Sequence, residues 1–265
     1  MSDDLIKILD GNTFVVSDGR GDIEASPTDP TGLFSFDTRF LSRWVLTVDG
    51  QRLNTLSVGD LQYFETRFFL VPGRGTVYVD AKLSVIRRRA VRDGFHEWLE
   101  ILNHDDKPVE LTVRIEAGSD FADLFEVKDA LKKKGRYSSR VEDGRLLLAY
   151  ERQAYRRSTV ISATAGARVD EEGLTFDVRI QPHGEWTTEI DVAASLPRVQ
   201  RRGGRRSPTG KRRKEDMESN LRRWIGDAPR LECDWEQLRV TYRRSLVDLA
   251  ALRFSLPITP GKSLP

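Results

Sequence analysis

Apolar and polar residues alternate along most of this chain, from about residue 12 to about residue 193. The clearest segment is VELTVRIEA at 109–117, in which every second side chain is apolar. The same period of two recurs in VYVDAKLSV at 77–85, LTFDVRI at 174–180 and WTTEIDV at 186–192. A period of two is that of a β-strand with one buried face and one face in water. The pattern therefore predicts a mainly β protein.

Turn signals separate the alternating segments, namely HDDKP at 104–108, EDG at 142–144, EEG at 171–173 and PHG at 182–184. Alternating strands with such turns between them are typical of antiparallel hairpins in a sandwich. We count roughly a dozen candidate strands, which is more than an immunoglobulin-like domain holds. The sequence thus predicts a large antiparallel β-sandwich, followed by a short C-terminal helical segment.

The alternation stops after residue 197, and this change divides the chain into three expected parts. Residues 1–197 are expected to form the β-sandwich domain. Residues 198–214 hold nine Lys and Arg and no acidic residue, and their GG and SPTG break regular structure, so we expect a basic flexible linker. Residues 215–265 are expected to form a helical linker segment with a Pro/Gly-rich tail, SLPITPGKSLP.

Two helices are expected in the last part of the chain. The segment EDMESNLRRWI predicts a short one, and Asp234 is placed to cap a longer one, because Gln237 follows three residues later and comes close to a capping box. Apolar or aromatic residues then recur at helical spacing, at Trp235, Leu238, Tyr242, Leu249 and Leu252. This spacing predicts an amphipathic helix with one buried stripe.

The composition excludes several classes of protein. Charged residues make up 32% of the chain and hydrophobic residues 38%, as in a soluble protein. Cys233 is the one cysteine, so the chain alone cannot build a disulfide framework or a cysteine zinc site. No segment approaches the roughly 18 apolar residues of a membrane helix, and the start MSDDLIKILDG lacks the signal-peptide pattern. We expect a cytoplasmic protein without cofactor, metal or membrane contact.

Three motifs have simpler explanations than a functional site. HEWLE at 96–100 resembles the zinc motif H-E-x-x-H, but Glu100 stands in place of the second His and a strand is predicted here. The tripeptide RGD at 20–22 fits a polar turn. Residues 198–214 could bind a polyanion, but they lack the aromatic side chains that stack on single strands. We interpret this segment as a solvated linker, and nucleic acid is not an expected partner.

The segment GLFSFDTRFLSRW at 32–44 places charges of both signs among aromatic residues. Asp37 and Arg39 are two residues apart, so on one continuous strand they share a face and can pair or bind a common partner. Phe36, Phe40 and Trp44 would then lie on the opposite face. We interpret the two charges as a structural or inter-domain ion pair. The alternative is a sugar contact at the edge of a neighbouring domain's cleft.

A second group of charges lies in AGSDFADLFEVKDA at 117–130. Asp120, Asp123 and Glu126 are spaced by three, so a helical turn would place them on one face. Their apolar neighbours Phe121 and Phe125, with Leu124, would anchor the other side. We favour a structural role for this group, in a crossover segment packed across the sandwich. A ligand role is the alternative, since paired acids carry sugar chemistry.

These two segments carry a resemblance to a known family. GLF at 32–34, DTRFL at 37–41 and Trp44, followed by GSDFAD at 118–123 with Phe125 and Glu126, resemble the N-terminal domain of bacterial glycogen-debranching enzymes of the amylo-alpha-1,6-glucosidase type. The last helix adds a weaker likeness through Trp235, Ser245, Asp248, Leu249 and Leu252. The resemblance implies a β-supersandwich, a linker helix and then an α/α toroid that hydrolyses glycosides. The family's catalytic acids belong to the toroid, so we assign no catalytic residue here.

Three functions are therefore expected, in order of preference. The first is a non-catalytic N-terminal module of a glycoside hydrolase, packed against a helical toroid catalytic domain in the same or a separate polypeptide. The second is a free-standing module that binds an α-glucan. The third is a protein that binds nucleic acid or another polyanion through residues 198–214. We expect no hydrolase activity from this chain alone.

Overall fold

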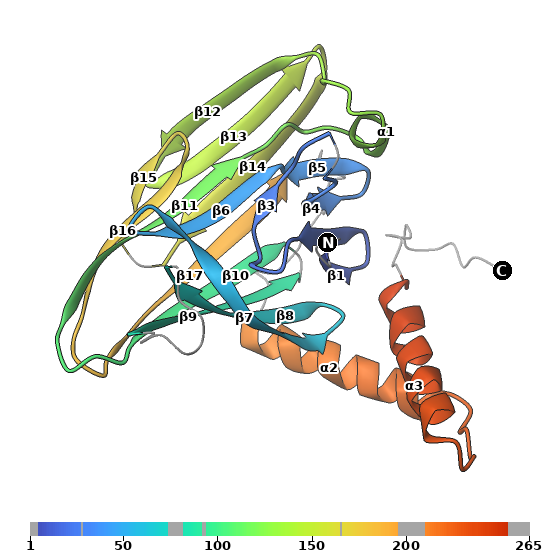
Figure 1. Cartoon of the computed structure of the whole chain (residues 1–265). Helices are drawn as coiled ribbons and strands as arrows, with labels where there is room; N and C mark the ends of the chain where they lie inside the picture. The colour runs from blue at the N-terminus through green and yellow to red at the C-terminus, as the bar shows by residue number, and fades with distance from the viewer. Residues whose placement is uncertain are drawn as a thin grey trace.

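The computed structural model describes residues 5–27, 29–73, 82–91, 94–164, 166–195 and 210–253. Strands dominate up to residue 195 and helices follow from residue 210 (Figure 1). The predicted linker over 198–214 lies outside the described residues as far as 209, and residues 210–214 already belong to a helix. Part of the strand predicted at 77–85 also lies outside them, and the described strand begins at Leu83.

The N-terminal strands form a small antiparallel sheet of four, in the order β1-β2-β4-β5. The strands are β1 Ile6–Asp10, β2 Thr13–Ser17, β4 Gly32–Ser35 and β5 Thr38–Leu41. The strand β4 is buried along its length, because it pairs with strands on both sides and lies against the larger sheet. The turn between β4 and β5 carries the first predicted motif to one end of the molecule (Figure 1).

The remaining strands form one antiparallel sheet of 13. Its order is β12-β13-β14-β17-β10-β9-β8-β7-β6-β11-β16-β15, with β3 paired to β6. The bounds are β3 Ile23–Glu24, β6 Arg43–Val48, β7 Gln51–Gln62, β8 Glu65–Pro72, β9 Leu83–Val91, β10 Phe95–Asn103, β11 Val109–Gly118, β12 Arg136–Glu142, β13 Arg145–Arg152, β14 Tyr155–Ala163, β15 Arg168–Asp170, β16 Gly173–Ile180 and β17 Glu185–Ser195.

The sheet folds over at β7, which pairs with β6 through its first residues and with β8 through the rest. Two layers thus face each other. Trp44 of β6 meets Phe95 of β10 edge to face at 5.7 Å, and Phe176 of β16 meets Trp186 of β17 at 5.2 Å. The predicted antiparallel β-sandwich is confirmed. The alternation that predicted it is visible in β10 and β11, where every second side chain enters one common core.

Charged residues occupy part of this core. Glu97 of β10 is fully buried and accepts hydrogen bonds from Arg87 and Arg89 of β9, with its Oε2 only 2.5 Å from Arg89 Nη2. Trp44 Nε1 donates to the same carboxylate at 3.1 Å. Arg87 also binds Asp22 at 2.7 Å, so the turn that contains the RGD tripeptide is held from inside. Burial by itself raises the pKa of Glu97, but the charges of Arg87 and Arg89 outweigh burial and hold that pKa below its ordinary range.

Both predicted C-terminal helices are present, as α2 Gly210–Asp227 and α3 Glu236–Ala251. A short helix, α1 Leu124–Lys128, precedes them after β11. The helices α2 and α3 pack on each other, and Trp224 Nε1 donates to the carbonyl of Leu246 at 3.0 Å. The predicted cap at Asp234 is wrong, because Trp235 occupies the N-cap position without a side-chain hydrogen bond. None of the helices that the structure describes is long and apolar enough to cross a membrane.

Candidate functional site

The β4–β5 hairpin does not have the geometry expected of GLFSFDTRFLSRW. A continuous strand was expected, but the chain turns at Phe36 and Asp37, where Phe36 adopts a left-handed φ of 54°. Asp37 therefore does not share a strand face with Arg39, and the predicted pairing of the two is wrong. The carboxylate of Asp37 instead accepts a hydrogen bond from the hydroxyl of Thr38 at 3.2 Å.

Arg39 of β5 pairs with Asp120, from the second predicted motif. Arg39 Nε donates to Asp120 Oδ1 at 3.0 Å and Nη2 donates to Oδ2 at 2.5 Å, which is a two-pronged arginine–carboxylate pair. The third nitrogen, Nη1, donates to the carbonyl of Thr31 at 3.3 Å. The side chain of Arg39 is 8% exposed and that of Asp120 is 38% exposed. The pair therefore lies at the boundary between the core and the surface.

Gly32 leaves the space that Arg39 occupies. A Cβ atom on Gly32 would lie 2.6 Å from Arg39 Cδ and 2.8 Å from the ring of Phe34. Such contacts are too short for any side chain, so only glycine allows the arginine stem to pass over β4. This gives a physical reason why a glycine opens the motif that also contains Arg39.

The segment 118–124 runs alongside β5 and is bonded to it through the backbone. Arg39 N donates to the carbonyl of Ala122 at 2.8 Å, and Leu124 N donates to that of Asp37 at 3.0 Å. Phe121, which has a positive φ of 49°, is buried with its ring edge-on to Phe40 at 6.0 Å. The two predicted motifs therefore form one structural unit, although the sequence shows them far apart.

The helix α1, Leu124–Lys128, begins directly after this segment. Asp123 is its N-cap and accepts from the amides of Phe125 and Glu126, while Glu126 accepts from the amide of Asp123 at 2.9 Å. This is a complete capping box. Asp120 precedes the helix and faces Arg39, so the predicted common face of Asp120, Asp123 and Glu126 is wrong.

Lys133 joins the two acids of the capping box. Its Nζ lies 2.6 Å from Glu126 Oε2 and 3.4 Å from Asp123 Oδ2. The amide of Glu126 and then the charge of Lys133 hold the pKa of Asp123 below its ordinary value. Burial by itself lowers the pKa of Lys133, but its bonds to Glu126 and Asp123 outweigh burial and raise that pKa.

These contacts define what the site can do chemically. Asp120 is bound to Arg39, and Asp123 and Glu126 are bound to Lys133, so each acid already has a cationic partner. A general acid needs a raised pKa, whereas that of Asp123 is lowered. The arrangement is that of a surface unit in which cationic side chains hold all three acids.

Exposed apolar side chains surround this unit, and their exposure was not expected. Phe36 is 53% exposed and Phe125 is 77% exposed, although both were predicted to point inward. Leu124 and Leu131 are also exposed at this end. The signal that could have revealed Phe125 is its place at the second position of a capped single-turn helix, where a short segment has no second face to bury it.

Comparisons with solved structures find matches at low similarity. A protein described as a kojibiose phosphorylase from the human microbiome matches with a TM-score of 0.43 and 8% identity, over 92% of this chain and 31% of that one. A protein described as an aldose 1-epimerase from Escherichia coli K12 matches with a TM-score of 0.42 and 8% identity, over 73% of this chain and 99% of that one. The chain thus spans about a third of the first of these structures. No curated protein matches its sequence.

Residues 8–191 match the family described as the N-terminal domain of some glycogen debranching enzymes. The matched region begins within β1 and ends within β17, so it contains both layers of the sandwich, the β4–β5 hairpin and α1. It also contains both partners of the Arg39–Asp120 pair. The chain therefore belongs to the family of N-terminal domains of glycogen debranching enzymes.

Proposed function

We propose that this chain is a non-catalytic domain that packs against the helical toroid catalytic domain of a debranching-type glycoside hydrolase, in the same or a separate polypeptide. The observation that carries the proposal is the outward-facing apolar stripe of α3. A soluble domain rarely leaves a contiguous set of large apolar side chains in water without a partner for them. The family, whose members are N-terminal domains, supports a neighbour of this kind.

The stripe consists of side chains that the sequence pattern had assigned to a buried seam. Trp235 is 61% exposed, Leu249 is 54% exposed and Leu252 is 70% exposed. Leu238 is exposed as well. The end of α3 is anchored on the rest of the protein through Ala250 and Ala251, which are buried. The helix is therefore held in place while its larger apolar side chains stay free for a second helical surface.

The unit around Arg39 and Asp120 supports a second contact with the same neighbour. The ion pair fixes the β4–β5 hairpin to the segment before α1, and this rigid unit presents Phe36 and Phe125 to the outside. In this proposal Asp37, Asp123 and Glu126 shape the unit and do not react with substrate. The unit would form one edge of the substrate cleft of the catalytic domain.

The test is assembly with the helical catalytic domain of the debranching-type enzyme from the same organism. We expect the purified chain and this domain to form a complex of one copy each, measured by size-exclusion chromatography with light scattering. Leu249→Glu should abolish the complex, because it places a charge in the apolar contact. Val141→Glu is the matched control, since Val141 is 42% exposed on the distant strand β12. The proposal would be overturned if the chain stayed a stable monomer and did not bind the catalytic domain.

An α-glucan-binding module is a second candidate function, and the exposed rings at the α1 end favour it. Tyr137 and Tyr155 are partly exposed. Tyr137 donates a hydrogen bond to the carbonyl of Asp120 at 3.2 Å, and Tyr155 is linked to the hairpin by a 3.3 Å hydrogen bond to Thr38. Sugar sites combine aromatic surfaces with a few polar groups. Calorimetric titration with maltoheptaose decides this candidate. Binding that Phe125→Ala removes would support it, and a flat titration at millimolar sugar would eliminate it.

A further inference from the structure

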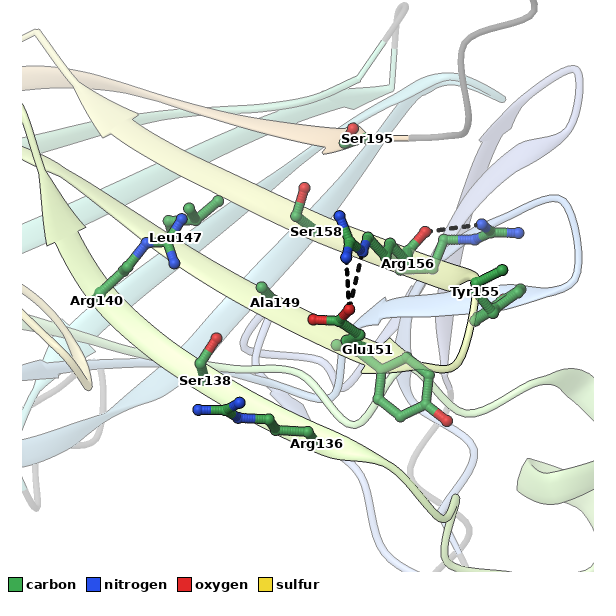
Figure 2. A pocket seen from close by; sticks show the side chains of 13 residues that line it. Arg136, Ser138, Arg140, Leu147, Ala149, Glu151, Tyr155, Arg156, Ser158 and Ser195 are labelled. Carbon is green, nitrogen blue, oxygen red and sulfur yellow. Dashed lines mark hydrogen bonds and ion pairs between the residues drawn. The ribbon is translucent and has the colours of Figure 1, made fainter.

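The outer face of β12, β13, β14 and β17 forms a broad hollow of about 950 Å³ (Figure 2). Its floor follows from the strand register. One row across the strands contains Arg136, Glu151 and Arg156, and the next contains Ser138, Ala149, Ser158 and Ser195. The volume lies within the range of small-ligand sites. The hollow lies apart from the helix α3, whose stripe carries the proposed function.

Arginines surround this hollow. Arg136 and Arg140 lie four residues apart on β12, and Arg156 lies two strands away from Arg136. Given the usual strand geometry, the three Cα positions span about 10 Å by about 13 Å. The residues that line the hollow include four arginines, Arg136, Arg140, Arg156 and Arg157, and one acid, Glu151. The face is therefore a local concentration of positive charge.

The ion pairs that these arginines form within the protein leave their positive charge available to a ligand. Arg156 Nη2 binds Glu151 Oε1 at 2.7 Å, and Arg140 Nε binds Glu142 at 2.6 Å, but all four side chains are about half exposed or more. Exposed ion pairs of this kind contribute little, so an incoming anion can compete for the guanidinium groups. Arg136 forms no ion pair with any residue that the structure describes.

The side chains at the centre of the hollow are small, and most of them carry a hydroxyl group. Ser138 and Ser158 flank Ala149, and Ser195 lies beyond Ser158 on the next strand. Within the described part of the chain the hydroxyls of these three serines make no hydrogen bond. Figure 2 shows Ser138 and Ser158 on either side of Ala149, with the guanidinium of Arg136 beside Ser138. Hydroxyl donors between arginine forks match a group with several acceptor oxygens. Small side chains leave room for that group to reach the strands.

We propose that this face binds the phosphate group of a phosphorylated sugar, with Arg136, Arg140 and Arg156 as the charged ligands and Ser138 and Ser158 as hydroxyl donors. Arginine suits a phosphate because its planar fork donates two parallel hydrogen bonds to it. The sugar part of the ligand rests on the proposed function in carbohydrate metabolism, whereas the phosphate part rests on this face alone. The phosphate group belongs either to a small sugar phosphate or to a phosphate-bearing glucan.

The test is titration calorimetry of the purified chain at low salt with glucose 1-phosphate, a phosphorylated maltooligosaccharide, unphosphorylated maltoheptaose and inorganic phosphate. We expect both phosphorylated sugars to bind and the unphosphorylated one not to bind at this face. Arg136→Ala combined with Arg156→Ala should weaken binding by tenfold or more, since each removes charge-assisted hydrogen bonds. Tighter binding of the oligosaccharide than of glucose 1-phosphate would identify a glucan as the source of the phosphate.

Arg179→Ala is the matched control, because Arg179 is 61% exposed on β16 and pairs with Glu110. It should leave the titration unchanged, and thermal melting should show all variants to be folded. Equal binding by the double variant and the control would overturn the proposal, as would binding of a single-stranded RNA oligomer without binding of either sugar phosphate. Leu249→Glu, which tests assembly with the catalytic domain, should keep phosphate binding, so failure of one proposal is distinguishable from failure of the other.

Discussion

The guanidinium of Arg39 holds both carboxylate oxygens of Asp120, which lies 81 residues later in the chain. The pair connects the small N-terminal sheet to the segment that follows β11, and backbone hydrogen bonds on both sides of it continue the connection. Each predicted family motif thus contributes one member of the same contact. The two motifs depend on each other, because the buried cation Arg39 of the first needs the partly buried anion Asp120 of the second as its partner.

Asp120→Ala should therefore destabilise the protein. It leaves the guanidinium of Arg39, which is 8% exposed, with the carbonyl of Thr31 as its remaining hydrogen-bond acceptor among the described residues. We expect the free energy of unfolding to fall by about 2 kcal/mol, because Asp120 is partly solvated and the loss is smaller than for a fully buried pair. Urea denaturation followed by circular dichroism measures the change.

The matched control for this experiment is Asp143→Asn, at a side chain that is 88% exposed in the β12–β13 turn. Asn tolerates the positive φ of 49° at that position, so we expect no measurable change in stability. If Asp120→Ala were as stable as this control, the Arg39–Asp120 pair would have no structural role.

Gly32→Ala tests whether Arg39 needs the space that the missing side chain of Gly32 leaves open. The added methyl would lie 2.6 Å from Arg39 Cδ, so the arginine must shift and its bonds to Asp120 must lengthen. We expect a loss of about 1–3 kcal/mol, as in other overpacked sites. Gly166→Ala is the control, since a Cβ there meets nothing within 4 Å. Differential scanning calorimetry should show a lower melting temperature for the first variant than for the second.

Local periodicity was sufficient to predict the sandwich but not the contacts of the candidate site. Asp37 and Arg39 have the spacing of a strand pair, and only the turn at Phe36, with its φ of 54°, separates their faces. Asp120 and Asp123 have the spacing of a helical turn, but the helix begins at Leu124. Both errors have one cause, which is that tertiary partners selected the backbone conformation at positions where local spacing allowed a regular element.

The local sequence pattern did not predict the buried charges of the core either. In β9 the inward positions include Arg87 and Arg89, where alternation predicts apolar side chains. Their partner Glu97 lies on the next strand and Asp22 lies 65 residues from Arg87. A pattern read along one strand cannot show that a second strand supplies the opposite charge. The run RRRA in β9 was the one visible signal, because three consecutive arginines must include at least one inward position.

Glu97→Gln should have the largest effect on stability among these variants. The carboxylate is fully buried and binds Arg87, Arg89 and Trp44, so its neutral replacement leaves two buried guanidinium groups with one nearby carboxylate, that of Asp22. We expect a loss of about 3–5 kcal/mol. Urea denaturation measures it, with Glu185→Gln at an exposed position of β17 as the control. A loss no larger than that of the control would show that the cluster is neutral for stability.

Acidification should loosen α1, because Asp123 caps the helix in its ionised form. The pKa of Asp123 is lower in the folded protein than its ordinary value of 3.8, so the ionised form stabilises the folded state. This stabilisation is complete above the ordinary pKa and is lost as the pH falls through the lowered folded value. The amides of Phe125 and Glu126, which donate to Asp123, should then lose protection from hydrogen exchange.

Lys133→Met tests whether the charge of Lys133 contributes to the loss of protection in α1 at low pH. Lys133 helps to lower the pKa of Asp123, so without its charge that pKa moves up toward 3.8 and the loss of protection begins at a higher pH. Lys132→Met is the control, since Lys132 is exposed and is not among the groups that shift Asp123. Nuclear magnetic resonance of the Glu126 amide across the acid range gives the midpoint for each variant. Identical midpoints in the wild type and Lys133→Met would contradict the role of Lys133, because the electrostatic link between α1 and the loop after it would then have no measurable effect on Asp123.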